Sequence, residues 1–573
     1  MKNLKRSLIF ISALALAATM PACSSKNSES SSGSSTTSKS DSSSSESKAQ
    51  ADGPLTPYAD EITVMLGRET IQNPKLPDGD TYEDNAYTRW LKKALNIKIK
   101  DAFEANGDDY NTQVSLALSS GEMPDMMKVS SKDVLRELYE NDMIADLTDA
   151  YNTYASDYIK QVYDSYDGRA LGDVTFDGKI MAIPATNVDT VGEVWIRSDW
   201  IKKLGMKIDE DKNGCITISE LEGIAKEFMQ KNPGNAQSVV GMAFAPWLTA
   251  GEPDGTYSIN TIAYALGAFP KTWMNVNGKV VYGSTTPETK TALKQVAAWF
   301  KNGLVDQQLG TRTWDDITAL LINGQTGITF GCWHIPDWLL NNVRSMDNKA
   351  TFESYAIEDA NGKVNCKHNN ATAGYFVVSK KYAHPEAAIK IVNLFYDEMT
   401  NSKTLKQDYP DVAKYQQDGV DGSTRPFNIE INKSTSLLDD YSDIEKGVNG
   451  EISPDQARTI ESRAVIQNVK NYLANPEGCE VVDWSKYHSR MKGIELIQNL
   501  TENNKLNWVT PIFPTTTQTM KTNWANLQKM EEETFIKIAT GAEDADTAFD
   551  QFVKDWNSMG GEQIISEIEE QLK

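Results

Sequence analysis

Cysteine is scarce in this sequence, with five residues in a chain of 573. Apart from Cys23, the cysteines are widely spaced and form no CxxC pair: Cys215, Cys332, Cys366 and Cys479. Disulfide-dense scaffolds, zinc sites and thiol redox sites depend on closely spaced cysteines, so none of these classes is indicated. The spacing leaves one or two disulfides open.

Histidine is scarcer still, and the signatures of common catalytic sites are missing. None of the four histidines stands in HExxH spacing, and the chain has neither a GxSxG sequence nor a GxxxxGK[ST] loop. With 80 acidic residues, a pair of glycosidase carboxylates could be chosen anywhere, and only their separation in space would give the choice meaning.

Basic residues are also few relative to acidic ones. Lysine and arginine number 57 against 80 aspartates and glutamates, which gives a formal net charge of -23. No basic block follows the first residues of the chain. This balance argues against nucleic acid, or an anionic membrane face, as a partner.

No apolar run is long enough to span a bilayer. The longest, Leu8 to Ala18, has eleven residues, whereas a spanning helix needs about 20. Basic residues precede it and Met20-Pro21-Ala22-Cys23 ends it, a pattern that predicts a lipoprotein signal peptide over residues 1–22 with Cys23 as the lipidation site. Met20 and Pro21 depart from the usual leucine and small residue. The alternative is a short signal anchor that stays attached.

Residues 24–50 are mostly serine and include no aromatic or large aliphatic residue. Such a segment cannot collapse into a core, so we expect residues 23–52 to form a flexible tether that spans roughly 30 Å root-mean-square. The roughly 520 residues that follow are too many for one ordinary core. Two lobes are therefore predicted.

Strand-like and helix-like segments alternate after Asp60, which predicts an α/β fold around a largely parallel sheet. Ligands of open α/β sheets lie beyond the carboxyl ends of the strands, which would put Arg68 and Asn85 near a ligand-binding edge. Arg68 or Arg89 could meet a sugar carboxylate, although an ion pair within the protein is the alternative. The clearest predicted elements are strands at 61–66, 97–103, 180–183, 194–197, 326–330 and 374–379, and helices at 85–95, 289–302, 385–396 and over the last 50 residues, broken at Gly560-Gly561.

Residues 209–220 (DEDKNGCITISE) fit the twelve-position calcium loop at every position. Calcium takes six to eight oxygen ligands, and this spacing lets alternate side chains and a final carboxylate converge on one ion. The alternative is an acidic loop that caps a helix starting near Ser219. A single loop of this kind predicts a structural Ca²⁺ whose ligands are Asp209, Asp211, Asn213, the carbonyl of Cys215, Thr217 and Glu220.

Thirteen tryptophans suggest carbohydrate binding, because a flat ring can cover the apolar face of a pyranose. Five fall on apolar helix faces and are predicted to be core residues: Trp90, Trp200, Trp299, Trp524 and Trp556. Others stand where strands or loops end and are the predicted ligand contacts: Trp247, Trp273, Trp333 and Trp338. Weaker candidates are Trp484, Tyr487 and Trp508.

Short motifs along the whole mature chain resemble the family 1 extracellular solute-binding lipoproteins, in particular the long LplA-like branch that includes alginate-oligosaccharide-binding proteins. These motifs are SSGEMPD at 119–125, FDGKI at 176–180, AIP at 182–184, IRSDW at 196–200, KNGLVD at 301–306, NGQTG at 323–327, HPEAA at 384–388, and FDQFV at 549–553 with Trp556 and Gly560-Gly561.

The resemblance implies a two-lobed periplasmic-binding-protein-like fold of type II with hinge crossovers. We expect one lobe to comprise 53–188 and 370–430, and the other 189–369 and 431–573. In related sugar-binding proteins an aromatic residue after the glycine that ends a strand commonly lines the cleft, which favours Trp333.

The implied function is that of a monomeric, lipid-anchored binding protein on the outer face of the cell membrane of a Gram-positive bacterium. It would present an oligosaccharide to the permeases of an ABC transporter and would not be an enzyme. Two alternatives stay open: an extracellular carbohydrate-active enzyme, and a peptide or signal receptor of the same fold.

Overall fold

The computed structural model describes residues 52–251, 255–418 and 420–572. The predicted signal peptide, Cys23 and the serine-rich tether lie outside the described residues. Within the described ranges, no helix combines the length and the apolar character that a membrane crossing requires.

The first sheet has five strands in the order β2-β1-β3-β14-β6. β1 pairs in parallel with β2 and β3, whereas β14 is antiparallel to both β3 and β6. The sheet is therefore mixed, and the expectation of a largely parallel sheet holds only for its β2-β1-β3 half. The predicted strands at 61–66, 97–103 and 374–379 are confirmed by β1 (Ile62–Glu69), β2 (Ile97–Ala105) and β14 (Thr372–Val378). The other two strands of the sheet are β3 (Met126–Val129), which was not predicted, and β6 (Ile183–Thr186), which begins where the strand predicted at 180–183 was expected to end.

Helices cover both faces of this sheet, and each face has its own buried cluster. The predicted helix at 85–95 is confirmed by α1, whose Tyr87, Trp90, Leu91 and Leu95 are buried as its periodicity requires. The elements of this part are α1 (Ala86–Leu95), α2 (Gly107–Ser120), α3 (Lys132–Glu140), α4 (Thr148–Tyr154), α5 (Asp157–Asp164), α6 (Arg169–Asp173), β4 (Thr175–Phe176), β5 (Lys179–Ile180), α13 (Glu386–Val392), η3 (Asn393–Glu398), α14 (Met399–Asn401), α15 (Leu405–Asp408), α16 (Pro410–Asp418) and η4 (Gly422–Thr424).

The second sheet has four strands in the order β11-β7-β12-β8. β7 (Glu193–Arg197) is antiparallel to β11 (Ile328–Gly331) and to β12 (Phe352–Ile357), and β8 (Cys215–Ile216) is parallel to β12. Two small sheets accompany it, one of β9 (Trp273–Val276) and β10 (Lys279–Tyr282), the other of β13 (Val364–Lys367) and β15 (Leu506–Val509). The predicted strands at 194–197 and 326–330 are thus confirmed.

The helices of the second part include the predicted helix at 289–302, which is α10. They are α7 (Ser198–Leu204), α8 (Ile218–Lys231), α9 (Asn260–Ala265), η1 (Gly283–Thr285), α10 (Pro287–Lys301), α11 (Trp314–Ile322), η2 (Pro336–Leu340), α12 (Asn341–Met346), α17 (Ser436–Asn449), η5 (Pro454–Gln456), α18 (Ile460–Ala474), α19 (Val481–Lys486), η6 (Tyr487–Gly493), α20 (Ile494–Glu502), α21 (Met520–Ala539), α22 (Ala545–Trp556), η7 (Asn557–Gly561) and α23 (Glu562–Gln571).

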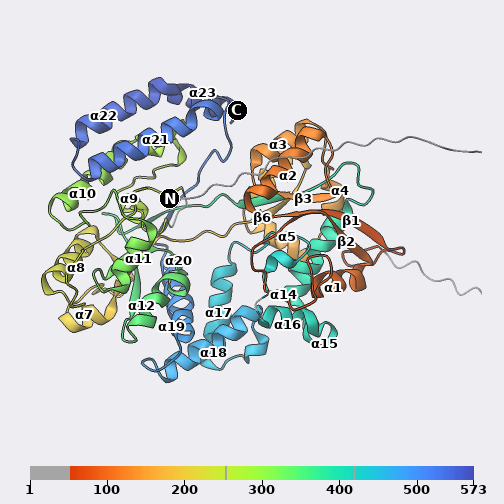
Figure 1. The fold of residues 1–573 in the computed structure, drawn as a ribbon, viewed down its shortest axis with the longest axis horizontal. Coiled ribbons are helices and arrows are strands. Elements are labelled where there is room, and N and C mark those ends of the chain that lie inside the picture. Colours follow the sequence, from red (N-terminus) through yellow and green to blue (C-terminus); the bar gives the residue numbers. More distant parts are fainter. Residues whose placement is uncertain (1–51, 252–254, 419, 573) are drawn as a thin grey trace, which may run out of the picture. The chain divides into compact units, whose positions relative to one another are not determined.

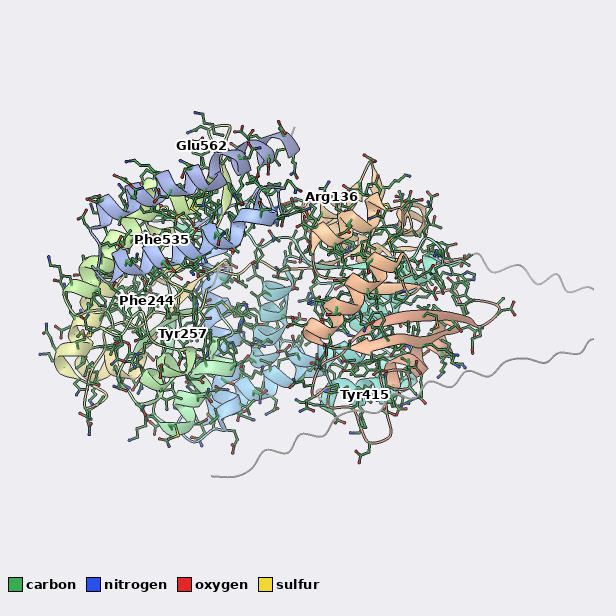
Figure 2. The ribbon with its side chains drawn as sticks, turned by 45° about the horizontal axis from the view of Figure 1, so that its top comes forward. Arg136, Phe244, Tyr257, Tyr415, Phe535 and Glu562 are labelled. Atoms are coloured by element: carbon green, nitrogen blue, oxygen red, sulfur yellow. The ribbon has the colours of Figure 1, made fainter. Side chains whose placement is uncertain are left out.

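Two of the C-terminal helices, α21 and α22, pack against α10, and α23 packs against β10 (Figure 1). Phe535 on α21 lies with Phe549 and Phe552 of α22 inside the core that also holds Phe244, and Figure 2 labels Phe535 and Phe244 within this packing. Gly560 has a φ of 120°, which a residue with a side chain rarely adopts. The predicted break at Gly560-Gly561 is confirmed.

The chain passes between the two sheets three times, and the crossing segments are bonded to each other. Asp189 in the first accepts hydrogen bonds from His368 Nδ1 at 2.6 Å and from the Asn369 amide at 2.7 Å in the second. The Asn432 amide of the third donates to Thr186 Oγ1 at 2.7 Å. Buried residues of the first sheet's clusters fall within 64–185 and 371–431, and those of the second sheet's within 191–366 and 444–568. The lobe boundaries themselves stay a prediction.

Candidate functional site

Three tryptophans form a stacked row beside the second sheet. The ring centroids of Trp247 and Trp314 are 6.5 Å apart with an interplanar angle of 9°, and those of Trp314 and Trp338 are 5.6 Å apart at 21°. The three residues are 36%, 36% and 39% exposed. Large apolar rings in soluble proteins are usually buried, so three exposed side by side form a candidate ligand surface. We call Trp247, Trp314 and Trp338 the tryptophan row.

The row lies at the carboxyl end of β11. The Tyr257 amide donates to the carbonyl of Phe330 in that strand, and the Tyr257 ring centroid is 4.6 Å from that of Trp314. Trp314 opens α11, whose first turn is fixed by a capping box between Thr313 and Asp316. This is the end of the sheet at which the first crossover enters β7, and ligands of open α/β sheets bind at such ends.

Trp333 continues this surface through a network of charged side chains. It is half-buried, and the guanidinium of Arg490 lies 4.5 Å from its ring centroid. The Arg490 guanidinium also donates hydrogen bonds to the carboxylates of Asp337 at 2.6 Å and Glu461 at 2.5 Å. The Lys486 ammonium donates to Asp337 at 3.2 Å. Because Asp337 immediately precedes Trp338, the network holds η2 and its tryptophan against η6.

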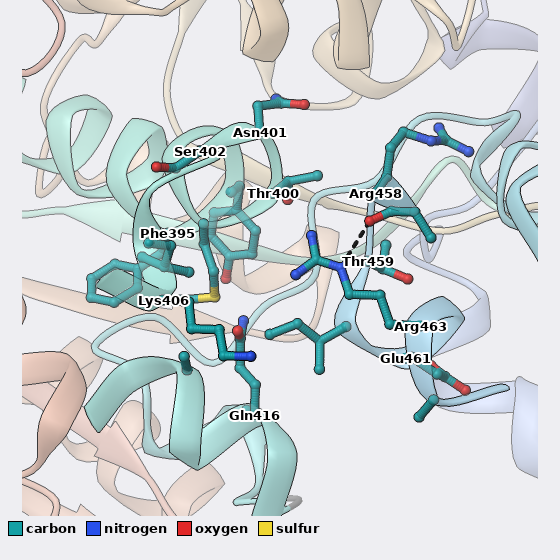
Figure 3. Close-up of a pocket in the computed structure, with 18 of the residues that line it drawn as sticks. Phe395, Thr400, Asn401, Ser402, Lys406, Gln416, Arg458, Thr459, Glu461 and Arg463 are labelled. Carbon is teal, nitrogen blue, oxygen red and sulfur yellow. Dashed lines mark hydrogen bonds between the residues drawn. The ribbon is translucent and has the colours of Figure 1, made fainter. Parts of the chain in front are cut away.

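A cavity of about 1470 Å³ adjoins this network. One wall is built from η3, α14 and α15, and the other from η5 and the start of α18 (Figure 3). Glu461 and Lys486 belong both to the network around Trp333 and to the lining of the cavity. The tryptophan row, the network and the cavity are therefore connected.

Three of the six predicted ligand contacts are buried and already engaged. Arg68 is 1% exposed and is paired with Asp101 at 3.1 Å. Asn85 has no exposed surface and caps α1, accepting hydrogen bonds from the amides of Tyr87 and Thr88. Trp273 is 6% exposed and packs against Tyr282. We therefore leave these three residues out of the candidate ligand surface, which retains Trp247, Trp333 and Trp338.

The loop at residues 209–220 has the turn that a calcium loop requires. The Asp209 carboxylate accepts hydrogen bonds from the amides of Asn213 and Gly214, and Gly214 has a φ of 76°. Thr217 caps α8, and the Glu220 carboxylate turns back to the Thr217 amide at 2.7 Å. Among the described residues no three His, Cys, Asp or Glu side chains are gathered as a metal site. The oxygen donors of the loop suit a hard cation, and the capping box of Thr217 and Glu220 at the start of α8 lies in the same segment.

The family follows from comparison with known sequences. A model described as bacterial extracellular solute-binding protein matches residues 73–401, which is more than half of the chain. The chain belongs to this family. It is therefore a solute-binding component of an ABC importer and not an enzyme.

Individual relatives of this solute-binding protein are distant. The polygalacturonan/rhamnogalacturonan-binding protein YtcQ of Bacillus subtilis is 22% identical over 465 residues, which cover 80% of this chain and 83% of YtcQ. The alginate-binding protein AlgQ2, solved without calcium ion, has a TM-score of 0.54 at 17% identity and covers 91% of this chain and 99% of its own. The EF-hand mutant of FusA from S. pneumoniae, solved with fructo-nystose, has a TM-score of 0.52 at 15% identity and covers 89% and 98%. The two structures show the shared fold.

Sequence reasoning missed Trp314 and Arg490. Trp314 follows the capping residue Thr313, and this position at the first turn of a helix was a usable signal that it does not face a core. Arg490 gave no signal, because its contacts with Trp333 and Asp337 join segments about 150 residues apart. Of the five predicted core tryptophans, Trp524 is partly buried and the others are 3% exposed or less.

The four cysteines within the described residues of the solute-binding protein are buried or partly buried. Cys215, Cys366 and Cys479 are free thiols, which answers the open question of disulfides for these three. Burial raises the pKa of the Cys215 thiol to about 11, so this side chain stays protonated at neutral pH. The Cys332 Sγ lies 3.0 Å from His334 Nδ1.

Proposed function

We propose that this solute-binding protein captures an oligosaccharide on the tryptophan row. The observation that carries the proposal is the row itself, with three exposed rings in register at the carboxyl end of β11. Ring faces cover the apolar faces of successive pyranoses, and the Arg490–Asp337 network beside Trp333 offers charged donors and acceptors for hydroxyl groups. The relatives named above bind acidic and neutral saccharides alike, which supports the class of ligand without fixing its charge.

The bonded crossovers support capture by closure of two lobes. We propose lobes of residues 53–188 with 370–430 and of 189–369 with 431–573, which turn about the three crossing segments. Closure around the ligand would bring the first lobe over the row and exclude water from it. A hinge of a few residues between rigid bodies is the common device for such closure.

Replacing Trp338 with alanine is expected to weaken oligosaccharide binding at least tenfold, because the exposed ring covers sugar that water would otherwise contact. Trp338 is half solvent-facing, so the melting temperature should change little. Isothermal titration with the tightest sugar from a mixed oligosaccharide panel measures the loss. Leu116→Ala removes a side chain that is 58% exposed on α2 of the other lobe and serves as the matched control.

Unchanged affinity in Trp338→Ala and in Trp247→Ala would remove the row from the ligand site. Release of a sugar product during the titration would favour the carbohydrate-active enzyme instead. Binding of peptides alone would favour the receptor of the same fold.

We propose that the mature protein is a monomer tethered by a lipid on Cys23 to the outer face of the membrane, where it meets the permeases of its transporter. The support is the segment pattern of residues 1–52, in which a charged start, an apolar run and Ala22-Cys23 precede a serine-rich stretch. Two acyl chains would hold it there, whereas one gives only marginal binding. Mass spectrometry of the membrane-extracted chain would identify the modified cysteine.

We propose that residues 209–220 bind a structural Ca²⁺. The pattern of oxygen donors supports this, as does the backbone turn at Gly214. Two relatives of the same fold support it further, since AlgQ2 was solved without calcium ion and FusA as an EF-hand mutant. Asp209, Asp211, Asn213, Thr217, Glu220 and the carbonyl of Cys215 would hold the ion. Bound calcium would hold β8 against its neighbour β12 in the second sheet. β12 in turn pairs with β7.

Calcium at 10 mM, as an added concentration, is expected to stabilise the protein by about 2.7 kcal/mol if its Kd is about 10⁻⁴ M. Asp211→Ala should lose this effect, because position 3 of the loop is a ligand and alanine supplies no side-chain oxygen. Glu210→Gln at position 2, which points away in such loops, should keep it and is the matched control. Differential scanning calorimetry with and without chelator gives the comparison, and an equal response of both variants would count against the loop.

A further inference from the structure

The cavity beside the network is lined by six basic residues in a protein whose net charge is -23. Three of them are neutralised by acidic neighbours: Arg425 by Glu430, Arg458 by Asp443 and Lys486 by Asp337. The other three, Lys403, Lys406 and Arg463, make no ion pair with any residue that the structure describes. Only Glu430, Asp455 and Glu461 bring negative charge to the lining.

These three cations stand on opposite walls. Lys403 and Lys406 come from the segment of α14 and α15, and Arg463 comes from the first turn of α18. Figure 3 shows the side chains of Lys406 and Arg463 reaching into the space between the walls. Arg463 Nε donates to the Ala457 carbonyl at 2.9 Å, which orients the guanidinium and leaves its outer edge toward the cavity. The two walls belong to different lobes of the proposed division.

An unpartnered acceptor lies in the same lining. The side-chain oxygen of Gln416 is buried and has no hydrogen-bond partner among the described residues. Buried polar atoms of native proteins are nearly always hydrogen-bonded, so this oxygen awaits a donor such as a hydroxyl group. The floor near it includes the aromatic side chain of Phe395.

We infer that this cavity binds the carboxylate groups of an acidic oligosaccharide, a uronide. The inference rests on the proposed function and adds the charge of the ligand. A carboxylate accepts two parallel hydrogen bonds from a guanidinium, and Lys406 opposite can take the same or the next acid group. A sugar hydroxyl would satisfy Gln416. Because the cations stand on both walls, a bridging uronide also draws the walls together.

The test uses trigalacturonate, its methyl ester and inorganic phosphate in isothermal titrations, beside a panel of neutral and other uronide trisaccharides. The best-binding uronide is expected to bind at least 30-fold tighter than its neutral ester, with an affinity that falls as salt rises. Arg463→Gln and Lys406→Gln should each weaken uronide binding about tenfold and leave ester binding unchanged. Lys446→Gln, an exposed charge on α17 outside the cavity, is the matched control.

Each outcome is decisive. Equal affinities for acid and ester, or unchanged uronide affinity in both variants, would overturn the inference. Phosphate binding that depends on Arg463 without any uronide binding would identify a site for free anions and would overturn it too. If a neutral sugar of the panel binds and no uronide does, the inference falls while the proposed function stands. If no saccharide binds, both fall.

Discussion

Replacing Arg68 with methionine is expected to lower the free energy of unfolding by about 3–5 kcal/mol, because it leaves a buried carboxylate without its partner. The guanidinium pairs with Asp101, whose side chain is 3% exposed, and donates to the carbonyl of Arg425 at 2.8 Å. Burial raises the pKa of Asp101 to about 6, against the opposing effect of Arg68. Chemical denaturation of the wild type and the variant measures the loss.

The sign of the pH dependence follows from that pKa. A carboxyl whose pKa is higher in the folded than in the unfolded state costs stability as pH rises, and the variant raises the pKa of Asp101 further. The destabilisation by Arg68→Met should therefore be larger at pH 8 than at pH 5, and Asp101→Asn should remove most of that difference.

Arg89→Met is the matched control, since Arg89 pairs with Asp80 and Asp84 while 48% of its side chain is exposed. Surface pairs contribute about 0–1 kcal/mol, so this change should cost less than about 1 kcal/mol. Comparable losses of unfolding free energy in the two variants would show that the buried pair contributes no more to stability than the exposed pairs. If Arg68→Met keeps normal stability but binds sugar more weakly, Arg68 would belong to the ligand site after all.

The layered α/β fold could be predicted from the sequence because its signals are local. Alternating strand and helix patterns at residues 61–103 correspond to β1, α1 and β2, and the glycine pair at 560–561 marks a real break. The direction of β14 could not be predicted. Its orientation depends on the crossing segment that returns from the second sheet and enters β14 beside the end of β6, which is a property of the whole chain.

The candidate site was predictable only in part, for a related reason. Trp247 and Trp338 were identified because they stand where local elements end, and both are exposed in the tryptophan row. Trp273 has the same local setting, but the C-terminal helices, some 250 residues further along, bury it against Trp556. Arg68 likewise pairs with Asp101, and no sequence pattern near Arg68 indicates this pairing. Burial by distant segments is invisible to a local pattern.

Replacing Glu531 with glutamine is expected to stabilise the protein at pH 8 by up to about 3 kcal/mol, while having little effect at pH 4.5. Glu531 on α21 is 1% exposed, and the hydroxyl of Tyr282 donates to one of its oxygens at 2.9 Å. The other oxygen has no hydrogen-bond partner among the described residues. Burial raises the pKa of this carboxyl from 4.5 to about 7, with Lys271 opposing the shift.

The raised pKa means that the folded state holds a proton which the unfolded state releases above pH 4.5. Stability of the wild type should therefore fall as pH rises from 4.5 to 7 and then level off, and each pKa unit corresponds to about 1.4 kcal/mol. Glutamine, always neutral, should flatten that slope. Glu532→Gln is the matched control, because Glu532 is the next residue on α21, pairs with Lys271 and has 47% of its side chain exposed. Denaturation curves at four pH values separate the two variants, and identical slopes in wild type and Glu531→Gln would mean that Glu531 is ionised in the folded protein.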